Sequence, residues 1–260
     1  MKKFTFIMIA IFAFNLSSAQ VGAFKSGEWF KFKMSYSGWM KAGNATLSVK
    51  EKQLDGKPVF HVVGKGWTTG AIKWFFKVED RYESYFDANK IIPYKFIRKI
   101  DEGGHKKDIE IKFNHKERTA FVHNKKYNSK KTIDTEPNVQ DMVSMYYYLR
   151  NNIDIETLKP GDEIKTNMFF DEENYGFKLK YLGEDIVKLK NGKKVESLMF
   201  RPYVMAGRVF KEEESLTLWV TKDKNKIPLR IKADLAVGSL RADLVAWKGL
   251  KYPFKIIVEN

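Results

Sequence analysis

The stretch Phe30-Lys31-Phe32-Lys33-Met34-Ser35-Tyr36 alternates large apolar side chains with polar ones over seven residues. Alternation with a period of two predicts a strand with one buried and one solvated face, which is typical of antiparallel sheets. The same alternation recurs along the chain, at residues 45–49, 109–113, 164–170, 216–220, 227–235 and 240–246. We therefore expect roughly thirteen or fourteen strands.

Short polar segments separate these strands and are typical of hairpin turns. They lie at residues 55–58, 87–90, 191–192 and 223–226. An early cluster of glycines, at positions 38, 43, 64, 66 and 70, predicts bulges or bends. The expected fold is mainly β: a large, strongly curved antiparallel sheet, open or partly closed and barrel-like, with one helix.

The expected helix lies near residues 137–151. Pro137 suits the first helical position, with Asp134 or Thr135 near the cap. Met142, Met145, Tyr146 and Leu149 then follow at i, i+3, i+4 and i+7, which is one apolar stripe of a helix. This stripe can pack on the sheet, or it can line an apolar cavity, where methionine adapts to varied ligands.

The first nineteen residues have the pattern of a secretory signal peptide. Lys2 and Lys3 precede an apolar run from Phe4 to Leu16, and Ser17-Ser18-Ala19 predicts cleavage after Ala19. We therefore expect residues 1–19 to be removed and residues 20–260 to form a single antiparallel β domain, periplasmic or secreted. No later apolar run approaches the roughly twenty residues that a membrane-spanning helix needs.

The chain contains no cysteine. No lipid can therefore be attached to a cysteine after the apolar run, so we expect an exported protein that is not lipid-anchored. Thiol catalysis, thiolate metal sites and iron–sulfur clusters are excluded for the same reason.

Charge gives a second group of candidate residues. The formal net charge is +15, and loss of Lys2 and Lys3 leaves +13. In an exported protein this favours acidic lipid or polysaccharide over nucleic acid. Residues 105–131 hold nine Lys or Arg and three Asp or Glu. Candidate polyanion-binding residues in this segment are Lys125, Lys126, Lys130 and Lys131, although a hairpin with a solvated lysine face explains the same pattern.

The segment from Trp67 to Phe76 ends in three consecutive aromatic residues. In a strand, Trp74 and Phe76 would share one face and Phe75 would take the other. Either both faces of this strand are buried, or one presents aromatic surface to a ligand or a membrane. Together with the helix stripe, the candidate ligand-binding residues are Trp67, Trp74, Phe76, Met142, Met145 and Tyr146.

Sequence signals for an enzyme are absent. The four histidines show no metal-ligand spacing, and there is no HExxH, GxSxG, Walker or GxGxxG motif. We therefore expect no catalytic residue, no metal site and no cofactor. Carboxylates cluster at residues 79–80, 171–173 and 212–214, but neighbours on a strand point to opposite faces, which favours surface pairing with lysines.

Several phrases, in their order and spacing, resemble one known family. They are Phe24-Lys25-Ser26-Gly27-Glu28-Trp29, residues 141–150 (DMVSMYYYLR), Leu218-Trp219-Val220-Thr221 with residues 227–230 (IPLR), and residues 238–244 (GSLRADL). Over about residues 24–247 the chain is similar to the exported bacterial family called domain of unknown function 3108. The resemblance implies a secreted or periplasmic, mostly antiparallel β domain with no established activity.

Three functional hypotheses follow. The first is a periplasmic, non-enzymatic binding or carrier-type protein for an apolar or amphipathic envelope molecule. The second is an envelope-associated protein that binds anionic lipid or polysaccharide through a basic face. The third is a glycan hydrolase. The expected partner is a lipid or another envelope component, no nucleic acid is expected, and the oligomeric state stays open.

Overall fold

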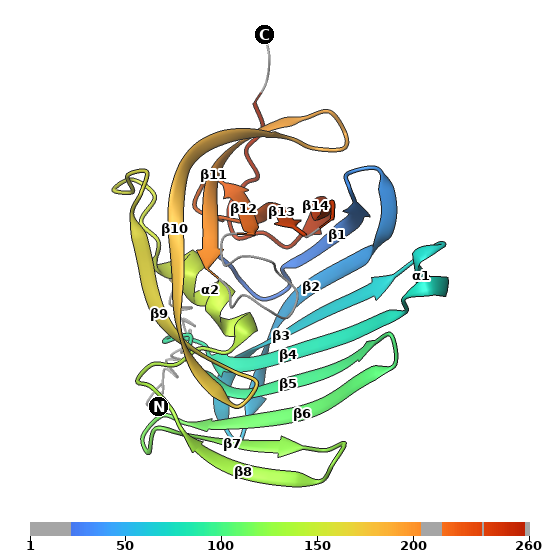
Figure 1. The fold of residues 1–260 in the computed structure, drawn as a ribbon. Helices are drawn as coiled ribbons and strands as arrows, with labels where there is room; N and C mark the ends of the chain where they lie inside the picture. Colours follow the sequence, from blue (N-terminus) through green and yellow to red (C-terminus); the bar gives the residue numbers. More distant parts are fainter. Residues whose placement is uncertain (1–21, 204–214, 236, 258–260) are drawn as a thin grey trace, which may run out of the picture.

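A computed structural model describes residues 22–203, 215–235 and 237–257 of the chain (Figure 1). Within these residues all strands belong to one sheet of 14 antiparallel strands, accompanied by two helices. The mainly β prediction is confirmed, including the alternating segments and the hairpin turns between them. The predicted signal peptide and the carboxylates at 212–214 lie outside the described residues.

The first half of the chain is a meander of eight strands interrupted by one short helix. Its elements are β1 (Trp29–Tyr36), β2 (Met40–Leu54), β3 (Lys57–Thr68), α1 (Ile72–Phe75), β4 (Val78–Asp87), β5 (Pro93–Glu102), β6 (His105–Asn114), β7 (Thr119–Asn124) and β8 (Ser129–Asp134).

The second half begins with the longer helix and continues as a six-stranded meander. Its elements are α2 (Met142–Asn152), β9 (Glu163–Phe170), β10 (Glu173–Lys188), β11 (Lys194–Tyr203), β12 (Leu216–Thr221), β13 (Pro228–Asp234) and β14 (Ser239–Lys248).

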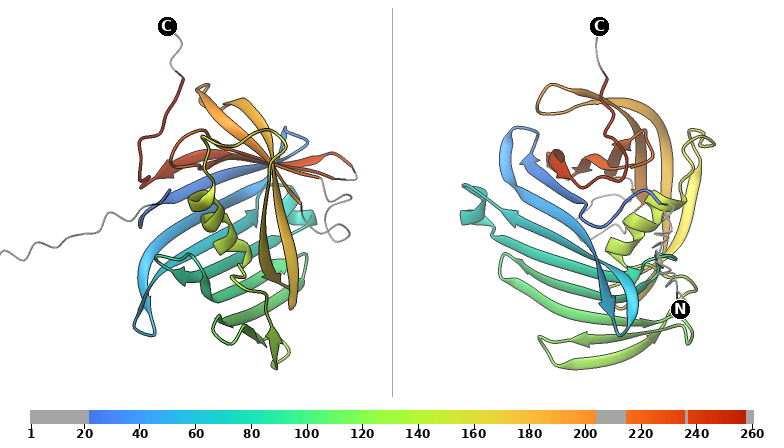
Figure 2. Two further views of the ribbon diagram at one scale, coloured as in Figure 1. Left: turned by 90° about the vertical axis from the view of Figure 1, so that its left-hand side faces the viewer. Right: turned by 180° about the vertical axis from the view of Figure 1, so that it is seen from behind.

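The two meanders join through the first and last strands. The strand order is β8-β7-β6-β5-β4-β3-β2-β1-β14-β13-β12-β11-β10-β9, so β1 pairs with β14 and the edges are β8 and β9. Those edges, although consecutive in sequence, are separated by α2 and do not close a backbone ladder. The result is a strongly curved, open sheet (Figures 1 and 2).

Side chains instead of a ladder link the β9–β10 hairpin to β5, β6 and β8, and we call this line of contacts the seam. Asp171, in the β9–β10 turn, forms ion pairs with Arg98 of β5 and Lys107 of β6. Lys131 of β8 lies 2.7 Å from the Glu172 carboxylate, and Asn174 donates to the Asp134 carbonyl oxygen. The seam therefore makes the sheet barrel-like although its strands do not close.

Helix α2 crosses one end of the curved sheet (Figures 1 and 2). Its side chains pack into the core there. Val143 and Tyr147 belong to an aromatic cluster on β3–β7 that includes Phe60 and Phe86. Met145 and Leu149 belong to a second cluster on β10–β12. The region between sheet and helix is thus a packed core.

The start of α2 differs from the prediction. It begins at Met142 instead of Pro137, because Asp141 is the N-cap: one of its carboxylate oxygens accepts hydrogen bonds from the Val143 and Ser144 amides, both at 2.7 Å. The Gln140 amide bonds to the Asn167 carbonyl oxygen of β9, which holds that residue in an extended pairing. Neither helix among the described residues is long and apolar enough to span a membrane.

The predicted strand over Trp67–Phe76 is wrong beyond Thr68. The chain leaves β3 there, turns at Gly70 with a φ of 63°, and forms the four-residue helix α1 before β4 begins. The three consecutive aromatics therefore lie at the tip of a hairpin and are exposed, not buried on both sides.

The early glycines have two different roles. At Gly43 a β carbon would lie 2.2 Å from the Trp67 carbonyl oxygen, and the β1–β2 register shifts at the neighbouring Met34–Ser35 step. Gly64 and Gly66, in contrast, lie in a regular ladder with no register shift. The predicted irregularity is confirmed near Gly43 and is wrong at Gly64 and Gly66.

Candidate functional site

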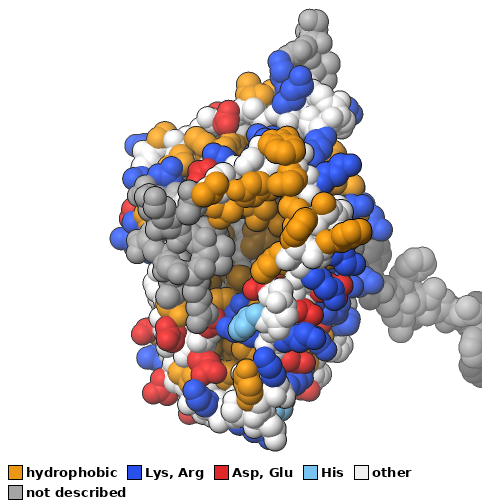
Figure 3. All heavy atoms as spheres, turned by 45° about the vertical axis from the view of Figure 1, so that its right-hand side comes forward, with side chains coloured by type: hydrophobic (Ala, Val, Ile, Leu, Met, Phe, Trp, Pro, Cys, Tyr) orange, Lys and Arg blue, Asp and Glu red, His pale blue; other side chains and the backbone are white. Residues whose placement is uncertain are grey.

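The two ends of the curved sheet are built differently. One end holds α2, residues 22–28 and the C-terminal segment from Leu250 to Phe254. Among the described residues, the other end, which we call the open end, holds the hairpin connections at 37–39, 69–77, 103–104, 125–128 and 171–172, and residues 235, 237 and 238 between β13 and β14. Figure 3 looks toward the open end and shows a hollow between hydrophobic side chains.

Along the concave face, burial is uneven between the helix end and the open end, where Ala233 of β13 and Ile100 of β5 are again buried. Val62 of β3 is fully buried in the cluster that contains Tyr147, and Leu229 of β13 is also fully buried. Two positions further along β13 on the same face, Ile231 is 39% exposed. Beyond the packed core the concave face therefore includes side chains that the described residues leave partly exposed, and this surface forms the hollow (Figure 3).

One wall of the hollow is apolar. Cross-strand pairing places a row of residues on the same face, namely Leu218, Ile231, Ala242 and Met34 on β12, β13, β14 and β1. All four are at least partly exposed. Ala45 of β2 lies opposite Phe32 in the next row, so small and large apolar side chains alternate around the wall.

Gly66 marks the deepest open position on β3. It lies opposite Ala45 on one side and Asp80 on the other. A β carbon built on Gly66 meets no atom within 4 Å, so the backbone there borders open space. Because its φ is not in the left-handed region, a larger side chain could be accommodated without backbone strain.

The opposite wall of the hollow begins with an acidic pair. Asp80 of β4 and Glu102 of β5 are diagonal neighbours on the concave face, since Asp80 pairs with Ile100 and Glu102 pairs with Val78. Burial, reinforced by the charge of Glu102 and a hydrogen bond to it, raises the pKa of Asp80 to about 6. One of the Asp80 oxygens is fully buried.

Basic and phenolic groups continue this polar wall toward the seam. Arg98 is the cross-strand neighbour of Tyr82, which itself lies opposite Gly64. The Arg98 guanidinium forms an ion pair with Asp171 and lies 4.7 Å from the centroid of the Phe170 ring. Burial raises the pKa of Tyr82 to about 12, so its hydroxyl stays protonated at neutral pH. The hollow is therefore amphipathic.

The six predicted ligand-binding residues do not form one site. Met145 is buried in the core, and Tyr146 packs against Tyr147 and Arg150. Met142 is 39% exposed at the first turn of α2. Trp67 lies on the convex face, because it is five residues beyond Val62 in the regular strand β3 and therefore points to the other side of the sheet. Trp74 and Phe76 lie on the hairpin tip at the open end.

The four predicted polyanion-binding lysines also separate. Lys125 pairs with Glu110 at 2.8 Å, and Lys126 donates to the Lys106 carbonyl oxygen. Lys131 faces the seam and pairs with Glu172, whereas Lys130 pairs across the strands with His123 on the other face of β8. A basic face built from these four residues stays a prediction.

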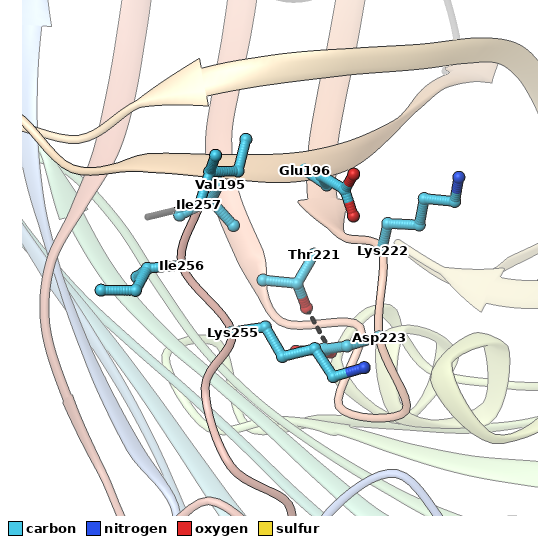
Figure 4. A pocket seen from close by; sticks show the side chains of 8 residues that line it. All are labelled: Val195, Glu196, Thr221, Lys222, Asp223, Lys255, Ile256 and Ile257. Carbon is cyan, nitrogen blue, oxygen red and sulfur yellow. Dashed lines mark hydrogen bonds between the residues drawn. The ribbon is translucent and has the colours of Figure 1, made fainter. Parts of the chain in front are cut away.

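A second cavity, of about 290 Å³, lies outside the hollow between residues 255–257 and β11–β12 (Figure 4). Its lining consists of Val195, Glu196, Thr221, Lys222, Asp223, Lys255, Ile256 and Ile257. Asp223 already accepts hydrogen bonds from the Thr221 hydroxyl and from the amides of Asn225 and Lys226. Its carboxylate thus organises the β12–β13 turn, and we place the candidate site in the hollow.

Ligands for a metal do not gather in the described ranges, where no group of three or more His, Asp or Glu could hold an ion. His61 is buried on the convex side and bonds to Glu83 at 2.6 Å. The Asp80–Glu102 pair does not suit glycoside hydrolysis, because directly hydrogen-bonded carboxyls are closer than the roughly 5 Å that such enzymes require. The hydrolase hypothesis gains no support from this pair.

Sequence reasoning missed the polar wall and the apolar row opposite. The sequence pattern assigns Asp80 to a surface cluster of carboxylates, and no motif marks Arg98 or Tyr82. A usable signal existed in the alternation itself: Asp80, Tyr82 and Ser84 are polar at the positions of β4 that share a face with buried Phe86. Polar residues on an otherwise apolar strand face indicate a site or a lined cavity.

Comparison with known proteins agrees with this architecture. The profile of a family described as "Protein of unknown function (DUF3108)" matches residues 31–245. A search of the curated proteins finds no match. Among solved structures, the β-barrel-like protein of domain of unknown function DUF1849 from Brucella abortus has a TM-score of 0.56 at 10% identity, covering 87% of this chain and 99% of that chain.

Two further solved structures are similar at a lower level. A DUF1089 family protein from Pseudomonas aeruginosa has a TM-score of 0.34 at 8% identity, covering 74% of this chain and 89% of that chain. A Bacteroides fragilis protein classed provisionally as exported has a TM-score of 0.33 at 8% identity, covering 88% and 98%. At 10% identity, the similarity to the Brucella protein concerns the fold alone.

Proposed function

The chain belongs to the DUF3108 family of proteins of unknown function, and we propose that its hollow binds one amphipathic molecule without chemical conversion. One observation carries this proposal: beyond the packed core the concave face holds a partly exposed apolar row opposite a polar wall. Ligand sites are typically concave and mostly apolar, with a few placed polar groups.

The apolar wall would hold the hydrophobic part of the ligand. A continuous row across four strands is formed by Met34, Leu218, Ile231 and Ala242. These side chains are less buried than those of the core. Transfer of apolar surface from water to this row stabilises a complex by about 25 cal/mol for each Å² buried.

The polar wall would hold the other end of the ligand. Asp80 retains a proton up to a pH of about 6, so the acidic pair can donate as well as accept a hydrogen bond below that pH. Tyr82 and Arg98 lie in the adjoining row. A ligand with an apolar body and a hydrogen-bonding head matches this arrangement better than a purely apolar one.

The proposed setting is the cell envelope. It rests on the predicted signal peptide and on the absence of cysteine, which together favour a periplasmic or secreted protein that is not lipid-anchored. A lipid or another envelope amphiphile is then the available ligand. Export itself is tested by comparing the mass of the mature protein with cleavage after Ala19.

The decisive experiment uses Gly66→Leu. The new side chain would occupy the hollow, where Gly66 has no neighbour within 4 Å, so it should fold normally and weaken binding of a fluorescent fatty-acid probe by at least about tenfold. Gly176→Leu is the matched control, because Gly176 is equally unobstructed but lies on the other face of β10 from Leu179, a residue of the α2-facing cluster.

Extraction of the native protein supplies an independent measurement. An organic extract of protein purified from its own host should contain a stoichiometric amphiphile by mass spectrometry, and the Gly66→Leu variant should lack it. Equal probe affinity in the wild type, Gly66→Leu and Gly176→Leu, together with an empty extract, would remove the proposal.

A further inference from the structure

Three hairpin tips at the open end carry exposed aromatic side chains. We call residues 37–41, 69–77 and 124–129 the rim. It contains Trp39 (79% exposed), Trp74 (90%), Phe75 (89%), Phe76 (52%) and Tyr127 (69%). Folding gains little from side chains that stay in water, and large apolar groups collected at one place mark interaction surfaces.

The central tip of the rim is held in a defined shape. Gly103, in the neighbouring β5–β6 turn, lies so close to Phe76 that an added β carbon would be 2.5 Å from the ring. The Gly103 amide donates to the Lys77 carbonyl oxygen at 2.7 Å, and the Val78 amide donates to the Thr68 hydroxyl at 2.9 Å. Trp74 and Phe75 are therefore presented outward by an ordered tip.

The charge of the rim has one sign. Its three segments contain five lysines, at positions 41, 73, 77, 125 and 126, and no aspartate or glutamate. Lys77 and Lys125 form ion pairs with Glu79 and Glu110 of adjoining strands, which are partly exposed contacts of small strength. The acidic β9–β10 tip, in contrast, is directed into the seam by Asp171 and Glu172.

We propose that the rim docks the open end of the protein onto a lipid bilayer with anionic headgroups. Tryptophan and phenylalanine lie favourably at the boundary between headgroups and acyl chains, and lysines beside them are attracted to anionic lipid. A second copy of this chain fits less well, because it would bring two lysine-rich rims together.

Docking through the rim would also set the mouth of the hollow against the bilayer. Only this consequence rests on the proposed ligand-binding function, because the rim and the hollow are formed by different residues. The two proposals can therefore fail separately: a rim variant should keep its affinity for a soluble fatty-acid probe, and Gly66→Leu should keep its affinity for vesicles.

The test is co-sedimentation with vesicles of phosphatidylcholine, with and without phosphatidylglycerol, at low and high salt. The wild type should bind the anionic vesicles and release them as salt rises. The double variant Trp74→Ser/Phe75→Ser should bind at least about tenfold more weakly, and Lys41→Glu/Lys73→Glu should lose most of the salt-sensitive binding.

Ile186→Ser is the matched control for apolar loss. Ile186 is 57% exposed but lies on β10 outside the three rim segments, so its replacement should leave vesicle binding unchanged. Wild-type binding by both rim variants would overturn the proposal, as would an equal loss in Ile186→Ser. Concentration-dependent dimerisation without vesicles, abolished by Trp74→Ser/Phe75→Ser, would assign the rim to a second copy and also overturn it.

Discussion

Arg150 connects three parts of the chain at the helix end of the molecule. Its guanidinium donates to both carboxylate oxygens of Glu28, at 2.6 and 2.9 Å, and to the Asn225 and Ala23 carbonyl oxygens. The side chains of Arg150 and Glu28 are 2% and 0% exposed. Helix α2, the segment before β1 and the β12–β13 turn are thus joined by one buried charge pair.

Replacement of Arg150 alone should therefore be strongly destabilising. Arg150→Ala leaves the Glu28 carboxylate buried without its partner, and we expect a loss of about 3–5 kcal/mol in the free energy of unfolding. Urea denaturation followed by circular dichroism measures it. The double variant Glu28→Leu/Arg150→Met should recover part of the loss, and a loss below about 1 kcal/mol in Arg150→Ala would contradict this account.

Individual residues were the hardest level to predict from sequence. The alternation identified which positions of a strand share a face, but not which face is concave. Trp67 therefore could not be separated from Trp74, although the structure places them on the convex face and at the open end. The pairing of Arg150 with Glu28, 122 residues apart, has no local pattern at all.

Among the elements, α2 owes its starting point to one buried acid. Asp141 is fully buried and accepts hydrogen bonds from two helix amides and, at 2.6 Å, from the Ser84 hydroxyl of β4. Burial outweighs those hydrogen bonds and raises the pKa of Asp141 from 3.8 to about 6. The cap therefore ties α2 to the sheet and is also a titrating group.

Asp141→Asn should alter the pH dependence of stability. A carboxyl whose folded pKa lies above its unfolded value stabilises the fold most below pH 3.8, and that contribution is lost as pH rises through about 6. Between pH 4 and pH 7, titration of Asp141 should lower the unfolding free energy of the wild type by up to about 3 kcal/mol. The variant should not show this decrease, because Asn does not titrate.

Urea denaturation at several pH values in that window checks this prediction. Asp80 has a similarly raised pKa in both proteins, so only the difference between wild type and variant is informative. Parallel pH profiles of the two proteins would show that Asp141 does not titrate as proposed.

Elements were predictable where one local rule acted alone. The hairpin strands follow from alternation and polar turns, and each of the four predicted turns joins two observed strands. Alternation could not exclude a strand at Trp74-Phe75-Phe76, because an aromatic run also satisfies a strand buried on both sides. The helix start was misplaced because Pro137 gives a valid start signal, whereas the Asp141 cap and the contact of Gln140 with β9 place the start at Met142.

At the scale of the whole molecule, the seam replaces the hydrogen-bond ladder that would close a barrel. Its contacts are the pairing of Asp171 with Arg98 and Lys107 and the pairing of Lys131 with Glu172. The Asp171 side chain is only 11% exposed, so these ion pairs are better shielded from salt than ordinary surface pairs. The curvature of the sheet therefore depends on few side chains.

Asp171→Asn should loosen this closure. Loss of one carboxylate removes the ion pairs that Arg98 and Lys107 form with Asp171, and we expect a destabilisation of about 1–3 kcal/mol with faster amide hydrogen exchange in β9. Glu163→Gln is the control, because Glu163 also lies on β9 but forms a more exposed pair with Lys178. Unchanged exchange in β9 of Asp171→Asn would contradict a closing role for the seam.

The fold class was predictable from the sequence, but the way the sheet curves and is held together was not. A curved antiparallel sheet with one substantial helix follows from the sequence, and the family resemblance is confirmed by the match over residues 31–245. The sequence could not show that the two meanders join through β1 and β14, because every strand pairing visible in a sequence is between neighbours. It also could not show that the helix fills one end of the sheet and leaves the other open.

The pairing of β1 with β14 has a consequence for the order of assembly. The first strand to emerge from the ribosome must wait for the last one, so the continuous sheet cannot exist before the whole chain is available. Each meander can form its own local pairings earlier, but the hollow between them cannot. A chain that is threaded through a translocation channel in an extended form would reach its destination with this final pairing still to be made.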